Sequence, residues 1–473
     1  MNKISKRTKI ITTIGPASEK KATIAKLFDA GMTTIRLNFS HGNYKEHGAR
    51  IKFAREVSSE KGSPISIMLD TKGPEIRIGK FKGGSIEITK GSKVKILTDS
   101  KSYSSKECVK NEMTVSYDMS QDLEAGKLVL VDDGKLQLTV TKVSPGVVLT
   151  EALNDHKVKT NKRVNLPGTK FSMPFLSEKD VKDIEYGCDQ KVDFIAASFV
   201  NTPEDIKQIK DILARKNATG IKIYSKIESQ YAVDNFDAIL AETDGVMVAR
   251  GDLGLEIPYY EVPVSQKMMI RKCREAGKPV IVATQMLDSM ETNPHPTRAE
   301  VTDVYLATEL GADATMLSGE SAAGEFPIKT VETMATINRR AETEFYKKLF
   351  YAKQLETISK ISSGPRSKKA LKIAKLTQDG GYPFVITLTR TGELMREVSK
   401  FRPNTNIIGV TKEQDIITKF GITSSVYMSQ DLEAFDQIKS NPDYAKQLAK
   451  HYGAETGNNI IVVDGKKITK LVV

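Results

Sequence analysis

The sequence predicts an α/β fold: a (β/α)8 TIM barrel with an inserted β-barrel lid domain and a C-terminal open-sheet α/β domain. Eight short apolar runs end in polar, glycine-punctuated segments, and stretches of helical period separate most of them. Residues 71–168 interrupt this alternation with a helix-poor stretch, and helix and strand alternate again after residue 364. These observations assign residues 1–70 and 169–346 to the barrel, 71–168 to the lid and 347–473 to the C-terminal domain.

The eight apolar runs are the expected barrel strands, because short buried strands that alternate with helices are typical of a parallel barrel. They are Lys9–Ile14, Thr34–Phe39, Ile65–Leu69, Asp193–Ser198, Ile221–Ile227, Gly245–Ala249, Pro279–Ala283 and Ala314–Leu317. Apolar residues recur at helical spacing before Gly31 and again after Pro203, and Ser18 is the expected N-cap of the first of these helices.

The insertion and the C-terminal region have patterns of their own. Polar and apolar residues alternate over Ser85–Leu97, and Asp133–Gly134 between two apolar runs predicts a β-hairpin. After the helical pattern of Ile328–Tyr346, a weakly patterned region leads to Gly364–Pro365. The elements expected beyond it are helices at Ser367–Leu376 and Glu393–Phe401 and strands at Phe384–Thr389, Asn406–Val410 and Ile460–Val463.

The composition argues against a membrane or secreted protein. The hydrophobic fraction is 39%, and no apolar run approaches the ~18 residues that a membrane span needs. The basic N-terminus has no apolar stretch of the signal-peptide kind. The three cysteines, Cys108, Cys188 and Cys273, have no paired spacing, which favours reduced thiols over disulfides or a zinc site. We therefore expect a cytoplasmic protein with no membrane partner.

The positive charge is concentrated in the last quarter of the chain. Residues 348–473 hold 20 Lys and Arg against 12 Asp and Glu, so they carry +8 of the total formal charge of +12. A basic module can attract nucleic acid, but this one has no long Lys/Arg block and no interleaved aromatic platform. The pattern favours a solvated surface or a pocket for a small anion.

Polar residues gather just past the predicted strands, where barrel enzymes place their active sites. Those at six strand ends are Arg36, Asn38, Ser40 and His41; Asp70, Thr71 and Lys72; Lys226 and Glu228; Arg250, Gly251 and Asp252; Thr284 and Gln285; Ser318 and Glu320. Cations, carboxylates and hydroxyls are therefore expected to converge on one mouth.

Three of these strand ends indicate specific chemistry. Lys226 and Glu228 are two residues apart on a strand and face the same way, either as catalytic groups or as a structural ion pair. Asp252 follows a glycine, and two carboxylates with room for water and substrate oxygens suit magnesium. Arg36 is suited to bind phosphate, although a lone arginine also serves as a salt-bridge partner.

Seven segments, in order along nearly the whole chain, resemble the active-site motifs of the pyruvate kinase family. They are TIRLNFSHG (Thr34–Gly42), LDTKGPEIR (Leu69–Arg77), NLPG (Asn165–Gly168), SKIES (Ser225–Ser229), ARGDLG (Ala249–Gly254), ATQML (Ala283–Leu287) and MLSGESA (Met316–Ala322). The resemblance implies transfer of the phosphoryl group of phosphoenolpyruvate to ADP, which gives pyruvate and ATP in the last step of glycolysis. It also implies a lid after the third strand, a regulatory C-terminal domain and a homotetramer.

The resemblance also implies roles for individual residues. Catalysis would fall to Lys226, Arg36 and Thr284, with Gly251 and Asp252 completing the substrate site. The expected ligands are Glu228 and Asp252 for Mg²⁺; Asn38, Ser40, Asp70 and Thr71 for K⁺; and Asn38, His41, Arg77 and Lys162 for the nucleotide. Glu75 stands where potassium-dependent members carry a glutamate. The proton donor to the enolate stays open, with a relay from Thr284, Ser318 and Glu320 through water as one route.

The C-terminal domain departs from the pattern of family members that bind fructose 1,6-bisphosphate. Thr389, Thr391 and Gly392 match half of the phosphate loop, but Leu394 stands where the last hydroxyl would be. The closing loop near the C-terminus is replaced by a tight turn through Asp464, Gly465 and Lys466. We expect weak or no activation by the bisphosphate; a smaller anionic effector at this loop and an ordinary turn without ligand both remain open.

Two other functions remain possible from the sequence. Magnesium-dependent barrel lyases that act on pyruvate enolates also hold their metal with Glu and Asp, but they lack a lid with nucleotide-binding Arg and Lys. An RNA-binding protein with a basic tail would bind in a strongly salt-dependent way, and Lys226 would not affect the binding.

Overall fold

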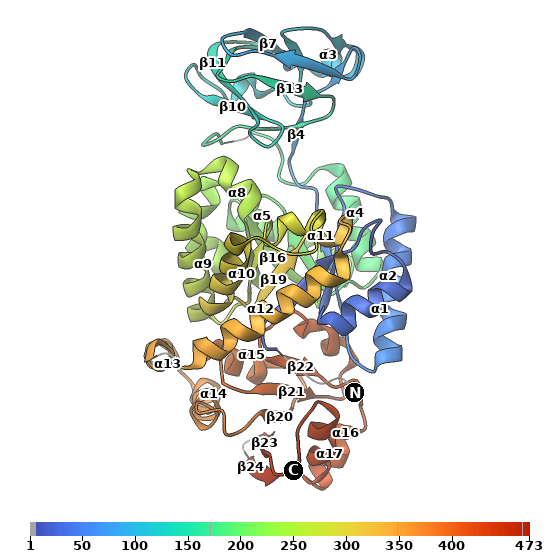
Figure 1. The fold of residues 1–473 in the computed structure, drawn as a ribbon, viewed down its shortest axis with the longest axis vertical. Helices are drawn as coiled ribbons and strands as arrows, with labels where there is room; N and C mark the ends of the chain where they lie inside the picture. The colour runs from blue at the N-terminus through green and yellow to red at the C-terminus, as the bar shows by residue number, and fades with distance from the viewer. Residues whose placement is uncertain (1–5, 171, 348, 466) are drawn as a thin grey trace.

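The computed structural model describes residues 6–170, 172–347, 349–465 and 467–473, and its three parts lie in a row. The lid stands at one end of the barrel and the C-terminal domain at the other (Figure 1). The first five residues of the predicted barrel domain, and Lys466 of the predicted tight turn, lie outside the described residues. No helix in the described ranges is long and apolar enough to cross a membrane.

Eight parallel strands close into the predicted barrel in the order β1-β19-β18-β17-β16-β15-β3-β2. They are β1 (Lys9–Thr13), β2 (Thr34–Asn38), β3 (Ser66–Asp70), β15 (Phe194–Ala197), β16 (Lys222–Ile227), β17 (Gly245–Ala249), β18 (Val280–Ala283) and β19 (Ala314–Leu317). Each strand agrees with its predicted bounds to within one residue at either end, because its buried apolar run is its clearest signal.

Helices surround the barrel. They are α1 (Lys21–Ala30), α2 (Tyr44–Lys61), α4 (Glu178–Asp189), α5 (Pro203–Arg215), α6 (Gln230–Asp234), α7 (Phe236–Glu242), α8 (Arg250–Glu256), α9 (Val262–Ala276), α10 (Arg298–Glu309), α11 (Gly319–Ala322) and α12 (Pro327–Lys347), with 3-10 turns η2 (Tyr259–Glu261) and η3 (Asp288–Glu291). The prediction that Ser18 caps the first helix was wrong. The N-cap of α1 is Lys20, and the Ser18 hydroxyl instead accepts a hydrogen bond from the Gly15 amide at 3.1 Å.

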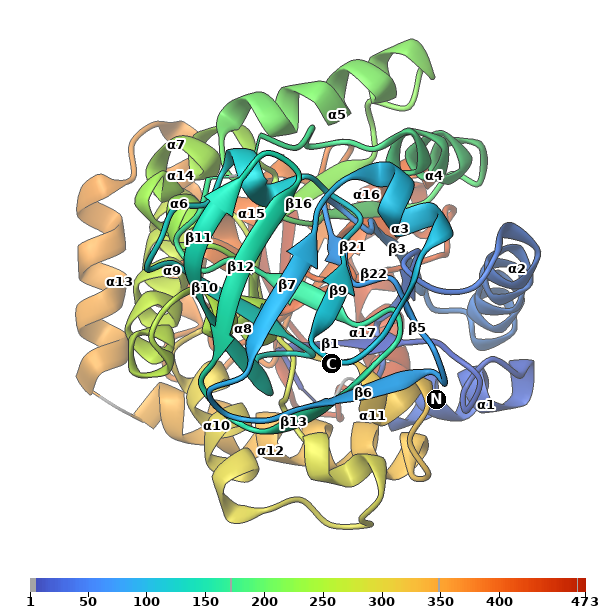
Figure 2. The ribbon, with the colours of Figure 1, turned by 90° about the horizontal axis from the view of Figure 1, so that it is seen from above.

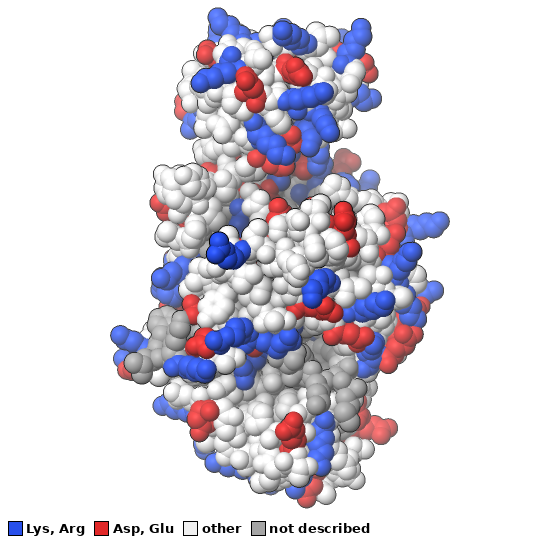
Figure 3. Space-filling view, in the orientation of Figure 1, with Lys and Arg blue, Asp and Glu red and all other residues white. Residues whose placement is uncertain are grey.

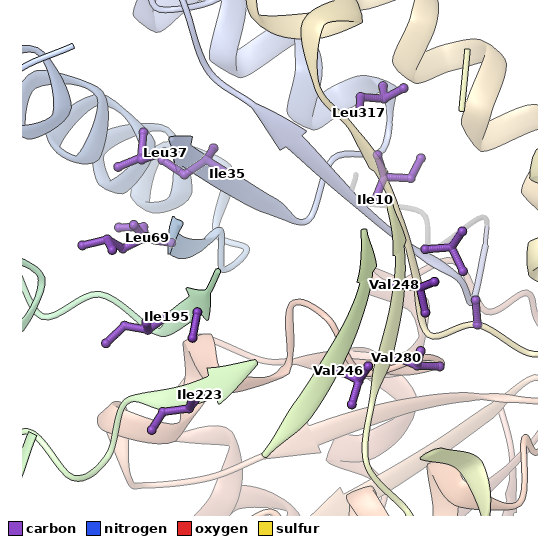
Figure 4. Close-up of a cluster of buried hydrophobic side chains, with 14 of the residues drawn as sticks. Ile10, Ile35, Leu37, Leu69, Ile195, Ile223, Val246, Val248, Val280 and Leu317 are labelled. Atoms are coloured by element: carbon purple, nitrogen blue, oxygen red, sulfur yellow. The ribbon is translucent and has the colours of Figure 1, made fainter. Parts of the chain in front are cut away.

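The barrel strands are apolar on both faces, as a buried parallel sheet requires. Outward-facing side chains from all eight strands pack against the helices, and Figure 4 labels Ile10, Ile35, Leu37, Leu69, Ile195, Ile223, Val246, Val248, Val280 and Leu317 among them. Inward-facing side chains such as Ile11, Phe194 and Met247 fill the barrel. Ile422 of the C-terminal domain joins this interior cluster and closes the amino end of the barrel.

The insertion after β3 folds as the predicted β domain. Its elements are β4 (Ile76–Arg77), β5 (Lys80–Phe81), β6 (Ser85–Ile88), β7 (Lys93–Leu97), α3 (Ser100–Ser105), β8 (Glu107–Cys108), β9 (Glu112–Thr114), η1 (Met119–Gln121), β10 (Leu128–Val131), β11 (Leu136–Ser144), β12 (Val147–Ala152), β13 (His156–Lys159) and β14 (Arg163–Asn165). The predicted hairpin is the antiparallel pair β10–β11. A bridge between Ile78 and Val115 joins the two edges of the seven-stranded sheet and so closes it. Seen from above, this domain covers the barrel (Figure 2).

The C-terminal domain is an open five-stranded sheet in the order β22-β21-β20-β23-β24, as predicted. Its elements are α13 (Leu349–Ile361), α14 (Pro365–Leu376), β20 (Phe384–Leu388), α15 (Glu393–Lys400), β21 (Asn406–Val410), η4 (Gln414–Phe420), β22 (Val426–Met428), α16 (Ala434–Ser440), α17 (Tyr444–His451), β23 (Asn459–Asp464) and β24 (Lys467–Val472). The weakly patterned region before Gly364 contains the helix α13, which the sequence did not predict.

Candidate active site

The cavity between the carboxyl ends of the barrel strands and the lid brings together most of the residues singled out from the sequence. It has a volume of about 430 Å³. Its lining residues are Arg36, Asn38, Ser40, His41, Asp70, Thr71, Lys72, Glu75, Arg77, Asp132, Asp133, Lys162, Arg163, Ser198, Phe199, Lys226, Glu228 and Asp252. In the space-filling view, basic and acidic side chains meet in the hollow between the lid and the barrel (Figure 3).

Asp70, the last residue of β3, holds two cations in this cavity. Its Oδ2 accepts a hydrogen bond from Arg36 Nε at 2.6 Å, and its Oδ1 lies 3.2 Å from Lys226 Nζ. Lys226 Nζ also donates to Ser198 Oγ at 2.7 Å and lies 3.0 Å from Glu228 Oε1. Because these groups are buried and fixed by several partners, the guanidinium and the ammonium are preorganised rather than free to rotate.

The environment keeps Lys226 charged. Burial alone would lower the pKa of Lys226, but the negative charges of Asp70 and Glu228 outweigh it and raise the pKa above its ordinary value. The ammonium therefore stays protonated at neutral pH. Such a group can compensate negative charge on a ligand, but it cannot act as a general base.

Glu228, just past β16, and Asp252 of α8 form a pair of carboxylates. Burial and the nearby charge of Asp252 raise the pKa of Glu228. Burial would also raise the pKa of Asp252, but the positive charges of Arg163 and Lys226 outweigh burial and lower this pKa. Across the described ranges, no group of three or more His, Cys, Asp and Glu side chains could enclose a metal. Two neighbouring carboxylates suit a cation such as Mg²⁺, which takes few protein ligands and keeps waters or substrate oxygens.

The backbone at Phe199 helps to fix this pair. Phe199 has a φ of 56°, in the left-handed region that bulky residues rarely adopt. In this conformation its amide donates to Glu228 Oε2 at 2.6 Å, and its ring lies beneath the lid arginine Arg163 at 5.0 Å. Backbone strain of this kind persists where surrounding contacts enforce it, often at functional sites.

The four predicted potassium ligands all line the cavity. The Asn38 side chain accepts the Ser40 amide at 3.1 Å, and the Thr71 hydroxyl accepts the Ser198 amide at 3.1 Å. Both carboxylate oxygens of Asp70 already face cations, so a further ion there would share them with Arg36 and Lys226.

The lid contributes its cations already paired. Lys162 Nζ lies 2.7 Å from Asp132 Oδ1, and Arg77 Nε lies 2.5 Å from Glu75 Oε1. Both cations line the cavity together with Asn38 and the exposed His41, so all four predicted nucleotide ligands border it. A bound anion would have to share these cations with carboxylates that already neutralise them.

Thr284 and Gly251 lie beside the cavity rather than among its lining residues. Thr284 has a φ of 69°, and its hydroxyl accepts the Gly251 amide at 2.7 Å and donates to the Ala283 carbonyl at 2.6 Å. The hydroxyl is therefore engaged with the backbone. Arg250 holds this segment from outside, because its Nη2 donates to the Thr284 carbonyl at 2.7 Å.

Glu320, the third candidate for the proton relay, is buried and bonded to backbone. Its two carboxylate oxygens accept the Leu287 amide at 3.2 Å and the Ser318 amide at 2.6 Å. Burial raises the pKa of Glu320 above its ordinary value. The Ser318 hydroxyl is buried without a protein partner, so it is the relay candidate with a proton to offer.

The predicted effector loop lies far from this site, at the start of α15. The Thr389 hydroxyl accepts the Gly392 amide at 2.8 Å, and the Thr391 hydroxyl accepts the Glu393 amide at 3.4 Å. These two threonines thus cap the amides that a phosphate would need.

Sequence reasoning overlooked several residues of the site. Thr13 and Ser198 stand at the ends of the first and fourth strands, and Thr13 Oγ1 accepts Arg36 Nη1 at 2.9 Å. The same strand-end argument would have found both had it been applied to those two strands. Arg163 and Asp132 come from the lid, where no sequence period indicated which side chains face the barrel.

Comparison with known proteins agrees with this geometry. The sequence-family model of the pyruvate kinase barrel domain matches residues 5–331, and the sequence-family model of the pyruvate kinase alpha/beta domain matches residues 369–471.

Individual relatives match over most of their length. A pyruvate kinase of Mycoplasma genitalium is 45% identical over 89% of this chain and 89% of its own, and one of Bacillus licheniformis is 42% identical over 96% of this chain and 76% of its own. The crystal structure of a pyruvate kinase from Cryptosporidium parvum superposes with a TM-score of 0.91 at 36% identity, covering 99% of this chain and 96% of that one. The chain therefore belongs to the pyruvate kinase family.

Proposed function

We propose that the cavity between barrel and lid is where this member of the pyruvate kinase family transfers the phosphoryl group of phosphoenolpyruvate to ADP. The observation that carries the proposal is the shared carboxylate of Asp70, which fixes Arg36 and Lys226 beside the pair Glu228 and Asp252. Phosphoryl transfer needs positioning and charge compensation more than covalent chemistry, and this arrangement supplies both.

Lys226 and Arg36 are assigned to the transferring phosphoryl group. In the transition state, negative charge grows or shifts on the equatorial oxygens of this phosphoryl group. An ammonium and a guanidinium that are already fixed in place stabilise this charge without reorganising. Asp70 is then a positioning residue, since it orients both cations.

Glu228 and Asp252 are assigned to Mg²⁺, with substrate oxygens completing the coordination. When bound, the ion would neutralise phosphate charge and align the reacting groups. On the lid, Arg77 and Lys162, with His41 and Asn38 opposite, are assigned to the polyphosphate of ADP.

The enolate end of the substrate is assigned to Gly251, Asp252 and Thr284. Thr284 orients the backbone of Gly251 through the hydrogen bond described above. We favour delivery of the final proton by a water held between Thr284 and Ser318, because the Ser318 hydroxyl is free of protein partners.

A potassium ion is assigned to Asn38, Ser40, Asp70 and Thr71, whose oxygens suit a weakly hydrated cation. The Glu75 carboxylate adds negative charge nearby. Burial would raise the pKa of Glu75, but Arg77 outweighs burial and lowers this pKa.

We expect turnover to require potassium, measured as the rate in potassium buffer against the rate in tetramethylammonium or sodium buffer. Equal rates in all three would contradict the assignment.

A homotetramer in the cytoplasm is the proposed working form. Tyr259 and Tyr260 of η2 and Val264 of α9 are 81%, 64% and 61% exposed, which suits a surface covered by a second copy. Sedimentation of the purified chain tests this.

The assay for the function itself is ATP formation from phosphoenolpyruvate and ADP, with pyruvate detected independently. Stoichiometric ATP and pyruvate are expected. Pyruvate without ATP would instead indicate a lyase or phosphatase.

A further inference from the structure

Arg163, the first residue of β14, crosses from the lid to the barrel and contacts the side chain of Asp252. Its Nη1 donates to Asp252 Oδ1, and its guanidinium lies 5.0 Å from the centre of the Phe199 ring. Both partners of the ion pair are mostly buried, with side chains 20% and 21% exposed. No role has been assigned to this arginine so far.

The contact places a protein cation on a carboxylate that is also assigned to a metal ion. Glu228 is buried and Asp252 is partly buried beside it, and two such neighbouring charges repel one another unless a cation stands between them. Lys226 lies 3.0 Å from the Glu228 carboxylate, and Arg163 contacts the Asp252 carboxylate. A divalent cation bound to Oδ1 of Asp252 would therefore compete with the guanidinium for this oxygen.

We propose that Arg163 is an exchangeable counter-ion for Asp252, which holds the lid to α8 until a divalent cation displaces it. This inference rests on the metal site proposed above. Arg163 is a positioning residue in this account, because it acts on the metal through Asp252.

The surroundings of Arg163 allow such an exchange. The Phe199 ring offers the guanidinium a second, cation–π contact that does not depend on Asp252. The Glu75 carboxylate, which also faces the cavity, supplies negative charge on the lid side. Since Arg163 begins the strand that leads into Leu166, Pro167 and Gly168, its release from Asp252 loosens the lid at its second connection to the barrel.

The test measures Mn²⁺ binding to the full-length chain without substrates, by electron paramagnetic resonance of the free ion. Loss of the competing guanidinium in Arg163→Gln should tighten Mn²⁺ binding by about tenfold, because the metal no longer has to displace a bound partner. The matched control is Lys159→Gln, which removes one positive charge from an exposed position of the same domain and should leave the affinity unchanged. Arg163→Lys, which keeps the charge, should bind Mn²⁺ nearly as wild type does.

Unchanged or weaker Mn²⁺ binding in Arg163→Gln would overturn the proposal. If that variant does not fold, hydrogen exchange of the β14 amides in the wild-type chain decides instead: exchange should become faster when Mn²⁺ is added, and no change or slower exchange would refute it. Asp252→Asn separates the two proposals. If Asp252→Asn binds Mn²⁺ as well as wild type, the proposed metal site is wrong. If Asp252→Asn weakens Mn²⁺ binding but Arg163→Gln does not tighten it, the metal site stands and the counter-ion role of Arg163 is wrong.

Discussion

The two ends of the barrel hold their buried charges in different ways. At the amino end, Arg402 of the C-terminal domain pairs with Asp313 at 2.5 Å and also donates to the Gly311 carbonyl at 2.9 Å, while the Ser424 amide donates to Asp313 at 3.0 Å. These charges are enclosed by partners from two domains. At the carboxyl end, Lys226 and its neighbours face a cavity.

The difference indicates what each end is for. The amino end is closed by Ile422, and a side chain on Gly421 would come within 2.1 Å of the Ser66 hydroxyl, so the two domains approach each other closely at this point. The mouth holds comparable charges with open volume beside them, and with left-handed backbone at Phe199 and Thr284. Enclosed charges need each other, because removing one partner leaves the other buried and unpaired, whereas charge that faces a cavity is available to a substrate.

The largest effect expected is on turnover in Lys226→Met, since the ammonium stabilises charge chiefly in the transition state. We expect a loss on the order of 10²–10³-fold in kcat, with phosphoenolpyruvate still bound. Lys222→Met is the matched control at the other end of β16, where Lys222 is paired 3.3 Å from Asp244. Steady-state kinetics and a binding titration of both variants make the comparison; near-normal turnover in Lys226→Met would show that this charge is structural.

At the amino end of the barrel, we expect the loss of a charge to lower stability rather than turnover. Arg402→Met leaves Asp313 buried without its main cation, which should cost about 3 kcal/mol of unfolding free energy, while kcat changes little. Lys412→Met removes an exposed pair in the same domain and should cost less than about 1 kcal/mol. Denaturant unfolding with an activity assay measures both. If Arg402→Met lowered kcat as strongly as stability, the division between the two ends would fail.

The fold was readable from the sequence because its strongest signals are local. The strand Gly245–Ala249, for example, is a five-residue buried apolar run between helical segments, and the structure has it at the same bounds. The helix α13 escaped because its region lacks a clear apolar period before Gly364. Ser18 was taken as a cap because its residue type suits one, but its hydroxyl is bonded to Gly15.

The candidate site could be predicted only in part, because part of it depends on tertiary contacts. Lys226 and Glu228 are placed together by their spacing on one strand. The contact between Arg163 and Asp252 joins residues 89 positions apart from two domains, and no period in either segment encodes it. The same holds for Asp132, which meets Lys162 only when the lid sheet has formed.

A smaller effect is expected at the lid hinge, where the Glu256 carboxylate lies close to Asn165 and Gly168. Burial raises the pKa of Glu256 to about 7. The folded chain therefore binds more protons than the unfolded chain between its unfolded pKa of 4.5 and about 7, and stability falls as pH rises through that window. Glu256→Gln should be more stable than wild type at pH 8, by about 1–3 kcal/mol, and nearly equal to it at pH 4.5.

Thermal unfolding at the two pH values measures this difference. Glu325→Gln, at an exposed position between α11 and α12, is the control and should track wild type at both. A Glu256→Gln variant that is equally or less stable than wild type at pH 8 would show that the hinge needs the carboxylate charged.

The smallest effect is expected from fructose 1,6-bisphosphate. Unlike the mouth of the barrel, the loop in the C-terminal domain already uses its hydrogen-bond donors within the protein. Thr389 and Thr391 cap the amides at the start of α15. The strands β23 and β24 pair as far as Asp464 and Lys467, so only two residues of the sequence separate the last paired positions. A bisphosphate would find half a phosphate site and no cover over it.

We therefore expect the bisphosphate to shift half-saturation by phosphoenolpyruvate less than about twofold, which corresponds to almost no coupling free energy. The measurement is the saturation curve with and without the bisphosphate, and with a sugar monophosphate, for the wild-type chain and Thr391→Glu. Strong activation by the bisphosphate would mean that the capped amides rearrange to receive it. Activation by the monophosphate that is lost in Thr391→Glu would place a smaller anion at this loop. The loop would then resemble the mouth of the barrel, because both would have hydrogen-bond donors available to a ligand.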